Sequence, residues 1–213
     1  MKRILSWLNR ILFSRRANAH VAHGNWNLDH GDIAGALREH TRAIALRPDY
    51  AVAFGARGNV HYTKQDYPAA LADYDHAIAL DPDFAMFHTN RGSLKIVMGD
   101  VAGGLADCET AVKLDSRSSL AYFNRAYAKH AANDLPGASA DYTRAIELDP
   151  RFVLAYNRRG NVKLAQGDLD GALADYTTAT ELDPGQPGYH SNRAAVLQAK
   201  GVEGRGRVID RND

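Results

Sequence analysis

Apolar, small and polar positions along this chain repeat with a period of 34 residues, which fits a unit of two helices joined by a turn. One phrase shows the period directly, as ADYDHAIALDP at 72–82, ADYTRAIELDP at 140–150 and ADYTTATELDP at 174–184. The pattern tiles the chain without insertion or deletion as five units and a half unit: 17–50, 51–84, 85–118, 119–152, 153–186 and 187–200. Because one such hairpin cannot bury its apolar face alone, we expect the copies to stack.

Each unit predicts two helices. A Gly-Asp or similar pair separates the first helix from the second, and Asp-Pro closes the second, as in LAQGDLDGALADYTTATELDP at 164–184. When each unit is numbered from 1, small residues recur at positions 8, 20 and 27, where two helix axes can come close. Larger apolar residues fill the rest of the second helix's inner face, for example Leu169, Leu173, Tyr176 and Leu182. The predicted fold class is therefore all-α.

The pattern resembles the tetratricopeptide repeat family in its 34-residue period, in the small residues at 8, 20 and 27, in aromatic residues near 4, 17 and 24, and in Pro at 32. The resemblance covers residues 17–200. It implies an α-solenoid, a right-handed superhelix of helical hairpins, whose inner face binds peptides or protein segments. Two departures stand out: Ser116 replaces Pro at position 32 of the third unit, and position 11, usually Tyr, is Asn27, His61, Lys95, Lys129 and Lys163.

Residues 1–16, MKRILSWLNRILFSRR, lie outside every repeat and predict a basic amphipathic helix. Three interpretations stay open for this segment. It could cap the first repeat, anchor the protein on anionic membranes through residues 2–13, or act as a secretory signal with ANA at 17–19 as its cleavage site. Arg10 interrupts the apolar stretch and argues against the signal. Residues 201–213 are predicted to be a disordered tail.

Charge and cysteine content exclude some function classes. The chain has 26 Lys and Arg against 25 Asp and Glu, so it lacks the global basic field that nucleic-acid binding normally needs. One cysteine, Cys108, excludes an intramolecular disulfide, and we expect it to be a small buried residue. No stretch approaches the ~20 apolar residues of a membrane span. The expected location is cytoplasmic, with peripheral membrane contact if residues 2–13 are an anchor, in preference to secreted or periplasmic.

No motif for catalysis or cofactor binding is present, so the chain is predicted not to be an enzyme and to hold no cofactor. One set of histidines could hold a metal: His20, His23 and His40 occupy positions 4, 7 and 24 of the first unit and should converge. In the other units, aromatic or polar residues at these positions do not make up a set of metal ligands. We therefore expect no metal.

The inner face should carry the function, through positions 2, 5, 6, 9, 12 and 13 of each first helix. An Asn side chain donates and accepts at once, so it can hold an extended peptide backbone while apolar neighbours take its side chains. The predicted protein-binding groove residues are Asn25, Asn59, Asn90, Phe123, Asn124, Tyr127, Arg158 and Asn161. The family's clamp for chaperone C-terminal carboxylates is not expected, because its Lys at position 5 is absent from every unit.

Position 7 is Arg from the second unit onward, and position 23 is always acidic. Pairing within a unit would leave Glu39 opposite His23 and Arg193 without an acid. We therefore predict structural pairs between neighbouring repeats: Glu39–Arg57, Asp73–Arg91, Asp107–Arg125, Asp141–Arg159 and Asp175–Arg193. The alternative is that both positions face solvent.

The predicted function is a protein–protein interaction scaffold or adaptor that binds a peptide or partner protein in its concave groove. Two alternatives remain. The chain could be an accessory subunit of a larger, membrane-surface complex, or it could form a homo-oligomer through the half repeat, whose second helix is missing. Within the solenoid, the third unit should open first, because Gly103, Gly104 and Ser116 all weaken it.

Overall fold

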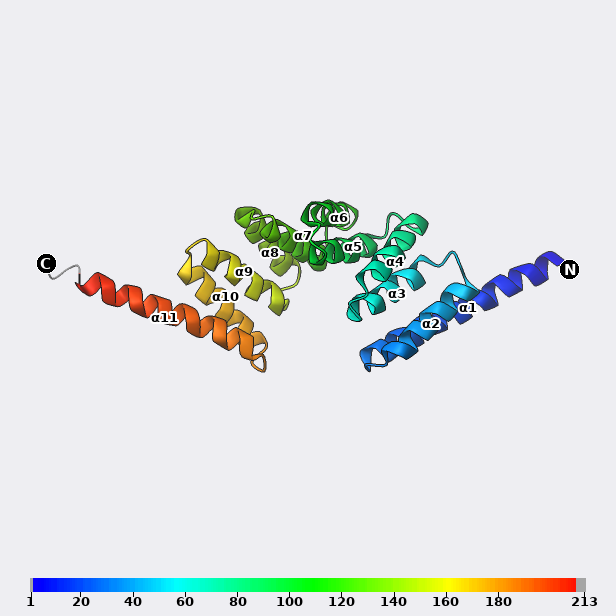
Figure 1. Cartoon of the computed structure of the whole chain (residues 1–213), viewed down its shortest axis with the longest axis horizontal. Coiled ribbons are helices and arrows are strands. Elements are labelled where there is room, and N and C mark those ends of the chain that lie inside the picture. The colour runs from blue at the N-terminus through cyan, green and yellow to red at the C-terminus, as the bar shows by residue number, and fades with distance from the viewer. Residues whose placement is uncertain (1, 210–213) are drawn as a thin grey trace. The chain divides into compact units, whose positions relative to one another are not determined.

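The structure, a computed structural model, describes the backbone of residues 2–209 and the side chains of residues 15–201. Every regular element in this part of the chain is a helix, and the chain divides into two compact units, Met1–Leu114 and Asp115–Asp213. The first unit contains α1 (Lys2–Asp29), α2 (Ile33–Leu46), α3 (Ala51–Thr63), α4 (Tyr67–Leu80), α5 (Ala85–Val97) and α6 (Val101–Leu114) (Figure 1). The second contains α7 (Ser119–Ala131), α8 (Leu135–Leu148), α9 (Val153–Ala165), α10 (Leu169–Leu182) and α11 (Pro187–Ile209).

Consecutive helices pack as antiparallel pairs, α1 with α2, α3 with α4 and α5 with α6 in the first unit, then α7 with α8 and α9 with α10 in the second. Each pair is one of the predicted 34-residue repeats, so the all-α fold class is confirmed. We call the two members of a pair helix A and helix B. Among the described helices, α11 is the helix A of a repeat that has no helix B.

The turn inside each hairpin is built as the Gly-Asp pattern predicts. Gly31, Gly99 and Gly167 adopt positive φ angles of 79°, 91° and 80°, a conformation that glycine reaches without strain. Gln65 and Asn133 take the same place in the other two hairpins, with φ of 61° and 63°. The next residue is Asp in all five turns, and its carboxylate accepts a backbone N–H of helix B, as Asp32 does from Gly35 at 2.8 Å.

Small residues set the closest approach within each hairpin. A Cβ added at Gly58 would lie 2.7 Å from the ring of Tyr74, and one added at Gly160 would lie 2.7 Å from the ring of Tyr176. Position 8 of helix A therefore packs directly on position 24 of helix B in the same repeat. Alanines at positions 20 and 27 are fully buried in the cores of both units: Ala36, Ala43, Ala70, Ala77, Ala111, Ala138, Ala145, Ala172 and Ala179.

The two ends of the chain differ from the predicted boundaries. Helix α1 runs unbroken from Lys2 to Asp29, so residues 2–16 extend the first repeat's helix A and do not form a separate element. No Gly or Pro stands between residues 1 and 23 to end a helix there. At the other end, α11 continues to Ile209, so the tail predicted from residue 201 is helical up to that point, because no Asp-Pro stop follows Lys200. The side chains of residues 2–14, which the membrane-anchor interpretation concerns, lie outside the described residues, as do residues 210–213.

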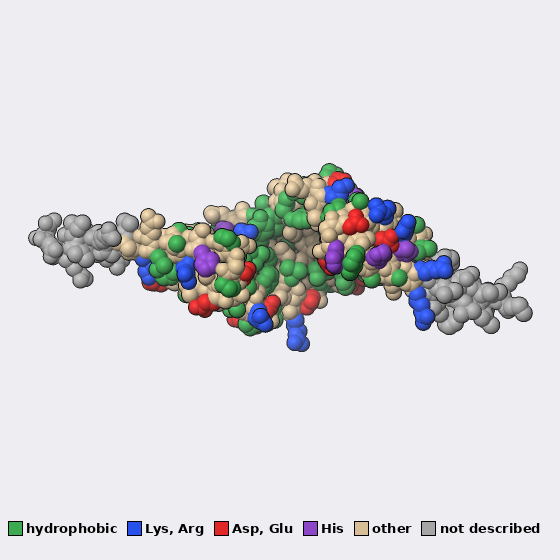
Figure 2. Space-filling view, turned by 90° about the horizontal axis from the view of Figure 1, so that it is seen from below, with side chains coloured by type: hydrophobic (Ala, Val, Ile, Leu, Met, Phe, Trp, Pro, Cys, Tyr) green, Lys and Arg blue, Asp and Glu red, His purple; other side chains and the backbone are tan. Residues whose placement is uncertain are grey.

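Two surface properties bear on function. Among the described residues, no helix is both long enough and apolar enough to cross a membrane. Acidic and basic side chains are interspersed on the face shown in Figure 2, so this face presents no continuous basic patch. That distribution agrees with the near-zero net charge.

Candidate functional site

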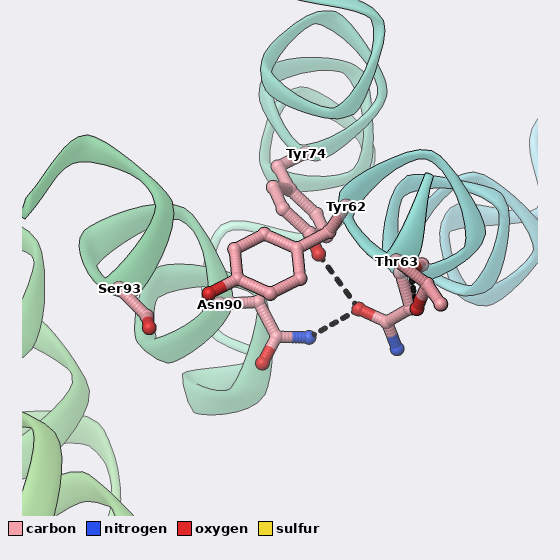
Figure 3. Close-up of a pocket in the computed structure, with 6 residues that line it drawn as sticks. Tyr62, Thr63, Tyr74, Asn90 and Ser93 are labelled. Atoms are coloured by element: carbon pink, nitrogen blue, oxygen red, sulfur yellow. Dashed lines mark hydrogen bonds between the residues drawn. The ribbon is translucent and has the colours of Figure 1, made fainter. Parts of the chain in front are cut away.

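A pocket of about 270 Å³ opens between α3 and α5 in the first unit. Its walls are uncharged and polar, with two aromatic rings: Asn59, Tyr62, Thr63, Tyr74, Asn90 and Ser93. The close-up in Figure 3 shows Tyr62, Asn90 and Ser93 around this pocket, with Tyr74 reaching in from α4. Two predicted groove residues, Asn59 and Asn90, thus meet in one place although 31 residues separate them.

One oxygen organises the pocket. The Tyr74 hydroxyl donates to Asn59 Oδ1 at 2.8 Å, and Asn90 Nδ2 donates to the same oxygen at 2.9 Å. Burial raises the pKa of the Tyr74 phenol well above its ordinary value, with further contributions from Tyr62 and Asp73, so the phenol stays protonated and remains a donor. The Nδ2 group of Asn59 and the Oδ1 of Asn90 have no partner in the described part of the chain. The pocket therefore presents one free donor beside one free acceptor.

The second unit repeats part of this arrangement. The Tyr176 hydroxyl donates to Asn161 Oδ1 at 2.7 Å, as Tyr74 does to Asn59, so position 24 again orients an Asn at position 9. In the fourth repeat, position 9 is Tyr127, which has no comparable acceptor. The Tyr142 hydroxyl there is buried and, within residues 15–201, has no hydrogen-bond partner.

Other predicted groove residues are placed differently. Phe123 is only 8% exposed, and its ring centroid lies 5.5 Å from that of Tyr142 and 4.8 Å from that of Phe152, so it belongs to the core. Position 5 faces the core throughout helices α1, α3, α5 and α7, and assigning it to the groove was wrong for this residue. Asn124 is 9% exposed and donates to the Leu120 carbonyl of its own helix at 3.2 Å.

Asn25 and Arg158 stay nearer the surface. Asn25 is exposed and makes no side-chain hydrogen bond within the described residues. Arg158 stacks its guanidinium on the ring of Tyr127, 5.6 Å from the centroid, which joins the fourth and fifth repeats by a cation–π contact. The Arg158 Nε is buried and has no hydrogen-bond partner in the part of the chain described.

The acid–arginine pairs form within each repeat, so the predicted pairing between repeats is wrong. Each guanidinium donates two hydrogen bonds of 2.6–2.8 Å to the position 23 carboxylate of its own hairpin: Arg57–Asp73, Arg91–Asp107, Arg125–Asp141 and Arg159–Asp175. The physical reason is the crossing of position 8 on position 24, which brings their neighbours 7 and 23 together. The predicted pairs Glu39–Arg57 and Asp175–Arg193, each with the Arg of the next repeat, do not form.

The lysines at position 11, a departure from the family pattern, add a second cation to these carboxylates. Lys95, Lys129 and Lys163 lie 2.9, 2.7 and 2.9 Å from the acids of their own repeats. Burial raises the pKa of Asp107 and Asp141, but hydrogen bonds from the Arg and the Lys outweigh it, and both pKa values lie below normal. Both carboxylates are therefore ionised, and the Arg and Lys side chains of the same hairpin balance their charge.

Arg57, Arg91 and Arg159 also reach the preceding repeat, through position 25. Arg91 Nη1 donates to Asp75 at 2.8 Å, and Arg159 Nη1 donates to Thr143 at 3.0 Å. A link between repeats thus exists, but it runs from position 7 back to position 25.

The first hairpin uses histidines where the others use Arg. Glu39 lies 2.5 Å from His20 and 2.6 Å from Arg42, and His23 is 3.7 Å away. His40 is fully buried under Gly24 and, among the described residues, neither ring nitrogen has a hydrogen-bond partner. Burial lowers the pKa of His40 to about 4, with Arg57 lowering it further and Glu39 opposing. His20 and His23 thus point to the Glu39 carboxylate, whereas His40 is a neutral core residue. No group of three metal-ligating side chains occurs in the described part.

Comparison with curated proteins finds no match. Among solved structures, the chain is similar to TTC0263, a thermophilic TPR protein of Thermus thermophilus, with a TM-score of 0.75, 18% identity, and coverage of 85% of this chain and 99% of that one. PilW, a type IV pilus biogenesis factor, matches with a TM-score of 0.81, 18% identity, and coverage of 87% and 86%. YrrB, a TPR protein with an unusual peptide-binding site, matches with a TM-score of 0.62, 20% identity, and coverage of 85% and 90%.

At these identities the structural matches establish the fold alone. The family model for the TPR repeat matches residues 58–95, 126–167 and 160–201, which together make up more than half of the chain. These matches span α4, α8, α9 and α10 and extend into α11. The chain belongs to the TPR repeat family.

Proposed function

We propose that this protein is an adaptor that holds an extended segment of a partner protein against the pocket between α3 and α5. TPR repeats generally mediate protein–protein interactions, and the family is generally non-enzymatic. The observation that supports this site is the free donor on Asn59 beside the free acceptor on Asn90. An extended peptide offers a C=O and an N–H in matching positions, so one residue of the ligand can use both groups.

The pocket is ordered before a ligand arrives. Because Tyr74 and Asn90 hold Asn59 Oδ1, the amide plane of Asn59 cannot turn freely, and binding costs less side-chain entropy. None of the lining residues is Asp, Glu, Lys, Arg or His. Recognition in this proposal therefore depends on backbone hydrogen bonds and on contact with Tyr62, and affinity should change little with salt.

The adaptor role is proposed as non-catalytic, since the sequence holds no motif for a nucleophile, phosphate loop or redox pair. A cytoplasmic location is part of this proposal, and a single cysteine is compatible with a reducing compartment.

The test selects a ligand and then removes the pocket's free acceptor. A random 12-residue peptide library displayed on phage is selected against the full chain, and the enriched peptides are titrated by fluorescence anisotropy. Asn90→Ala should weaken binding about tenfold, equivalent to about 1.4 kcal/mol, because the free acceptor is lost. Thr110→Ala is the matched control, since Thr110 lies on α6 and bonds only the Ala106 carbonyl of its own helix.

The melting temperature of each variant shows whether it still folds. Enriched peptides that bind Asn90→Ala as tightly as the native chain would refute the pocket as the docking site.

A further inference from the structure

Helix α11 presents the face that every other helix A buries under a helix B. In the complete hairpins this face is made by positions 7, 8 and 11. In α11 the same positions are Arg193, Ala194 and Leu197. The helix is held to the solenoid by a different face, where Val196 packs on the cluster around Tyr176, and by an ion pair of Lys200 with Asp170.

The exposure of this face contrasts with its equivalents. Position 8 is buried in all five hairpins of the described chain, whereas Ala194 is exposed. Leu197 is 51% exposed, although it stands where Lys129 and Lys163 reach the carboxylates of their own hairpins. Arg193 is half-buried, and no carboxylate of residues 15–201 lies within ion-pair distance of it.

Four equivalents show what such an arginine binds. In α3, α5, α7 and α9 the position 7 guanidinium holds a helix B carboxylate by two hydrogen bonds of 2.6–2.8 Å. Beside it, the small residue at position 8 packs on the residue that follows the acid, which is aromatic where Gly58 meets Tyr74 and Gly160 meets Tyr176. The α11 face keeps the arginine and the small residue. No helix of the described residues covers them.

We propose that the α11 face binds an amphipathic helix of a partner protein, which takes the place of the missing helix B. The partner helix carries an Asp or Glu for Arg193, directly followed by an aromatic residue that packs on Ala194. Small residues stand three positions before and four positions after the acid, as Ala172 and Ala179 do around Asp175. Because Leu197 replaces the lysine of the third, fourth and fifth repeats, the partner also offers an apolar side chain at that end.

A second copy of this chain does not fit the face. The position 23 carboxylates of the described B helices are already engaged, and each of these residues is at most 7% exposed: Glu39, Asp73, Asp107, Asp141 and Asp175. A copy would have to open one of its own hairpins to supply one of these acids together with the residues around it. A symmetric contact between two α11 helices would bring two Arg193 side chains together, which like-charge repulsion disfavours. The occupant is therefore a foreign helix, and this surface is independent of the α3–α5 pocket.

The probe is a peptide with the sequence of residues 167–184, GDLDGALADYTTATELDP, which has the required acid, aromatic and small residues. It is blocked at both ends, labelled, and titrated by fluorescence anisotropy against the full chain. We expect saturable binding that weakens at least tenfold when the protein carries Arg193→Met, and likewise when the peptide carries Asp175→Asn. The two changes together should cost no more than either alone, because both remove the same ion pair.

Two controls separate this face from other sites. Arg151→Met removes a cation from an exposed turn and should leave binding unchanged. Leu197→Glu should weaken binding through the apolar end of the face. No saturable binding up to about 1 mM peptide, or binding that survives Arg193→Met, would overturn the proposal. Sedimentation that shows a dimer abolished by Arg193→Met would assign the face to a second copy and would overturn it as well.

Discussion

At the scale of single residues, the stability of each hairpin depends on a buried carboxylate between two cations. Asp141 is 5% exposed and binds both Arg125 and Lys129 of α7. Removing one member of a buried ion pair leaves an uncompensated charge, which typically costs 3–5 kcal/mol. The sequence identified the charged positions, since Arg and acid recur at 7 and 23. It could not identify the partners, because that choice depends on which helices cross at position 8.

A double-mutant cycle distinguishes the two pairings. Asp141→Asn and Arg125→Met should couple by more than about 1 kcal/mol in the free energy of unfolding, because they remove the same contact. Asp141→Asn and Arg159→Met should be additive within about 0.5 kcal/mol. Urea denaturation of the single and double variants measures both terms. Coupling of Asp141 to Arg159 in place of Arg125 would contradict pairing within the repeat and support pairing between repeats.

His40 should make the first hairpin sensitive to acid. Its pKa is about 4 in the fold against 6.5 as the ordinary value, so the unfolded chain binds the proton more tightly. The stability that neutral His40 contributes is fully present above pH 6.5 and is lost as the pH falls from 6.5 to 4. Between pH 7 and pH 5 the loss should be about 2 kcal/mol. The pKa values of Asp107 and Asp141, also below normal, add losses in the same direction at still lower pH.

His40→Tyr is the matched variant for this effect. Tyr stands at position 24 in the second and fifth repeats, where its hydroxyl binds the Asn at position 9, and the first repeat has Asn25 at that position. The variant should lose the stability change between pH 7 and pH 5 that belongs to His40. Equal pH dependence of native chain and variant would show that another group titrates.

At the scale of elements, the sequence predicted the helices well and their ends less well. The caps by Asp32, Asp134 and Asp168 and the breaks at Gly31 and Gly167 follow from local chemistry. The unbroken α1 and the long α11 do not, because no terminator marks where a repeat helix begins or ends at the chain's extremes.

The third repeat should be the first to open. Gly104 lowers the helix propensity of α6, and it lies at a tight crossing where an added Cβ would come 2.8 Å from the Gly92 carbonyl oxygen. Ser116 lacks the rigidity of the usual Pro. Gly103 is less distinctive than the sequence suggested, because Gly35, Gly137 and Gly171 share its place beside a capping Asp. Hydrogen exchange should show weakest protection in α5 and α6. Uniform protection across all repeats would contradict this expectation.

At the scale of the whole molecule, the stacking of repeats was predictable and the site only in part. Repeated small and charged positions predicted the hairpins. Asn59 and Asn90 were identified as groove residues, but their shared link to Tyr74 was not, because it joins three helices. Phe123 was misassigned because apolar groove residues and core residues look alike in sequence.

Membrane association is a prediction for the entire chain. If residues 2–13 are a membrane anchor, their basic and apolar positions at helical spacing should make the full-length protein sediment with anionic vesicles in a salt-sensitive way. A chain that starts at Arg16 should stay in the supernatant. If neither form binds and the truncated form melts at a much lower temperature, the segment is a cap on the first repeat.

The most direct measurement of the central claim is a two-dimensional ¹⁵N NMR titration of the full chain with a library-selected peptide, followed at the side-chain amides of asparagine. We expect the largest shifts at the NH₂ groups of Asn59 and Asn90, because a bound backbone contacts both residues. Asn25, which lies outside the pocket, should shift little. Saturable binding that leaves Asn59 and Asn90 unmoved while other amides shift would contradict the assignment of the α3–α5 pocket as the peptide site.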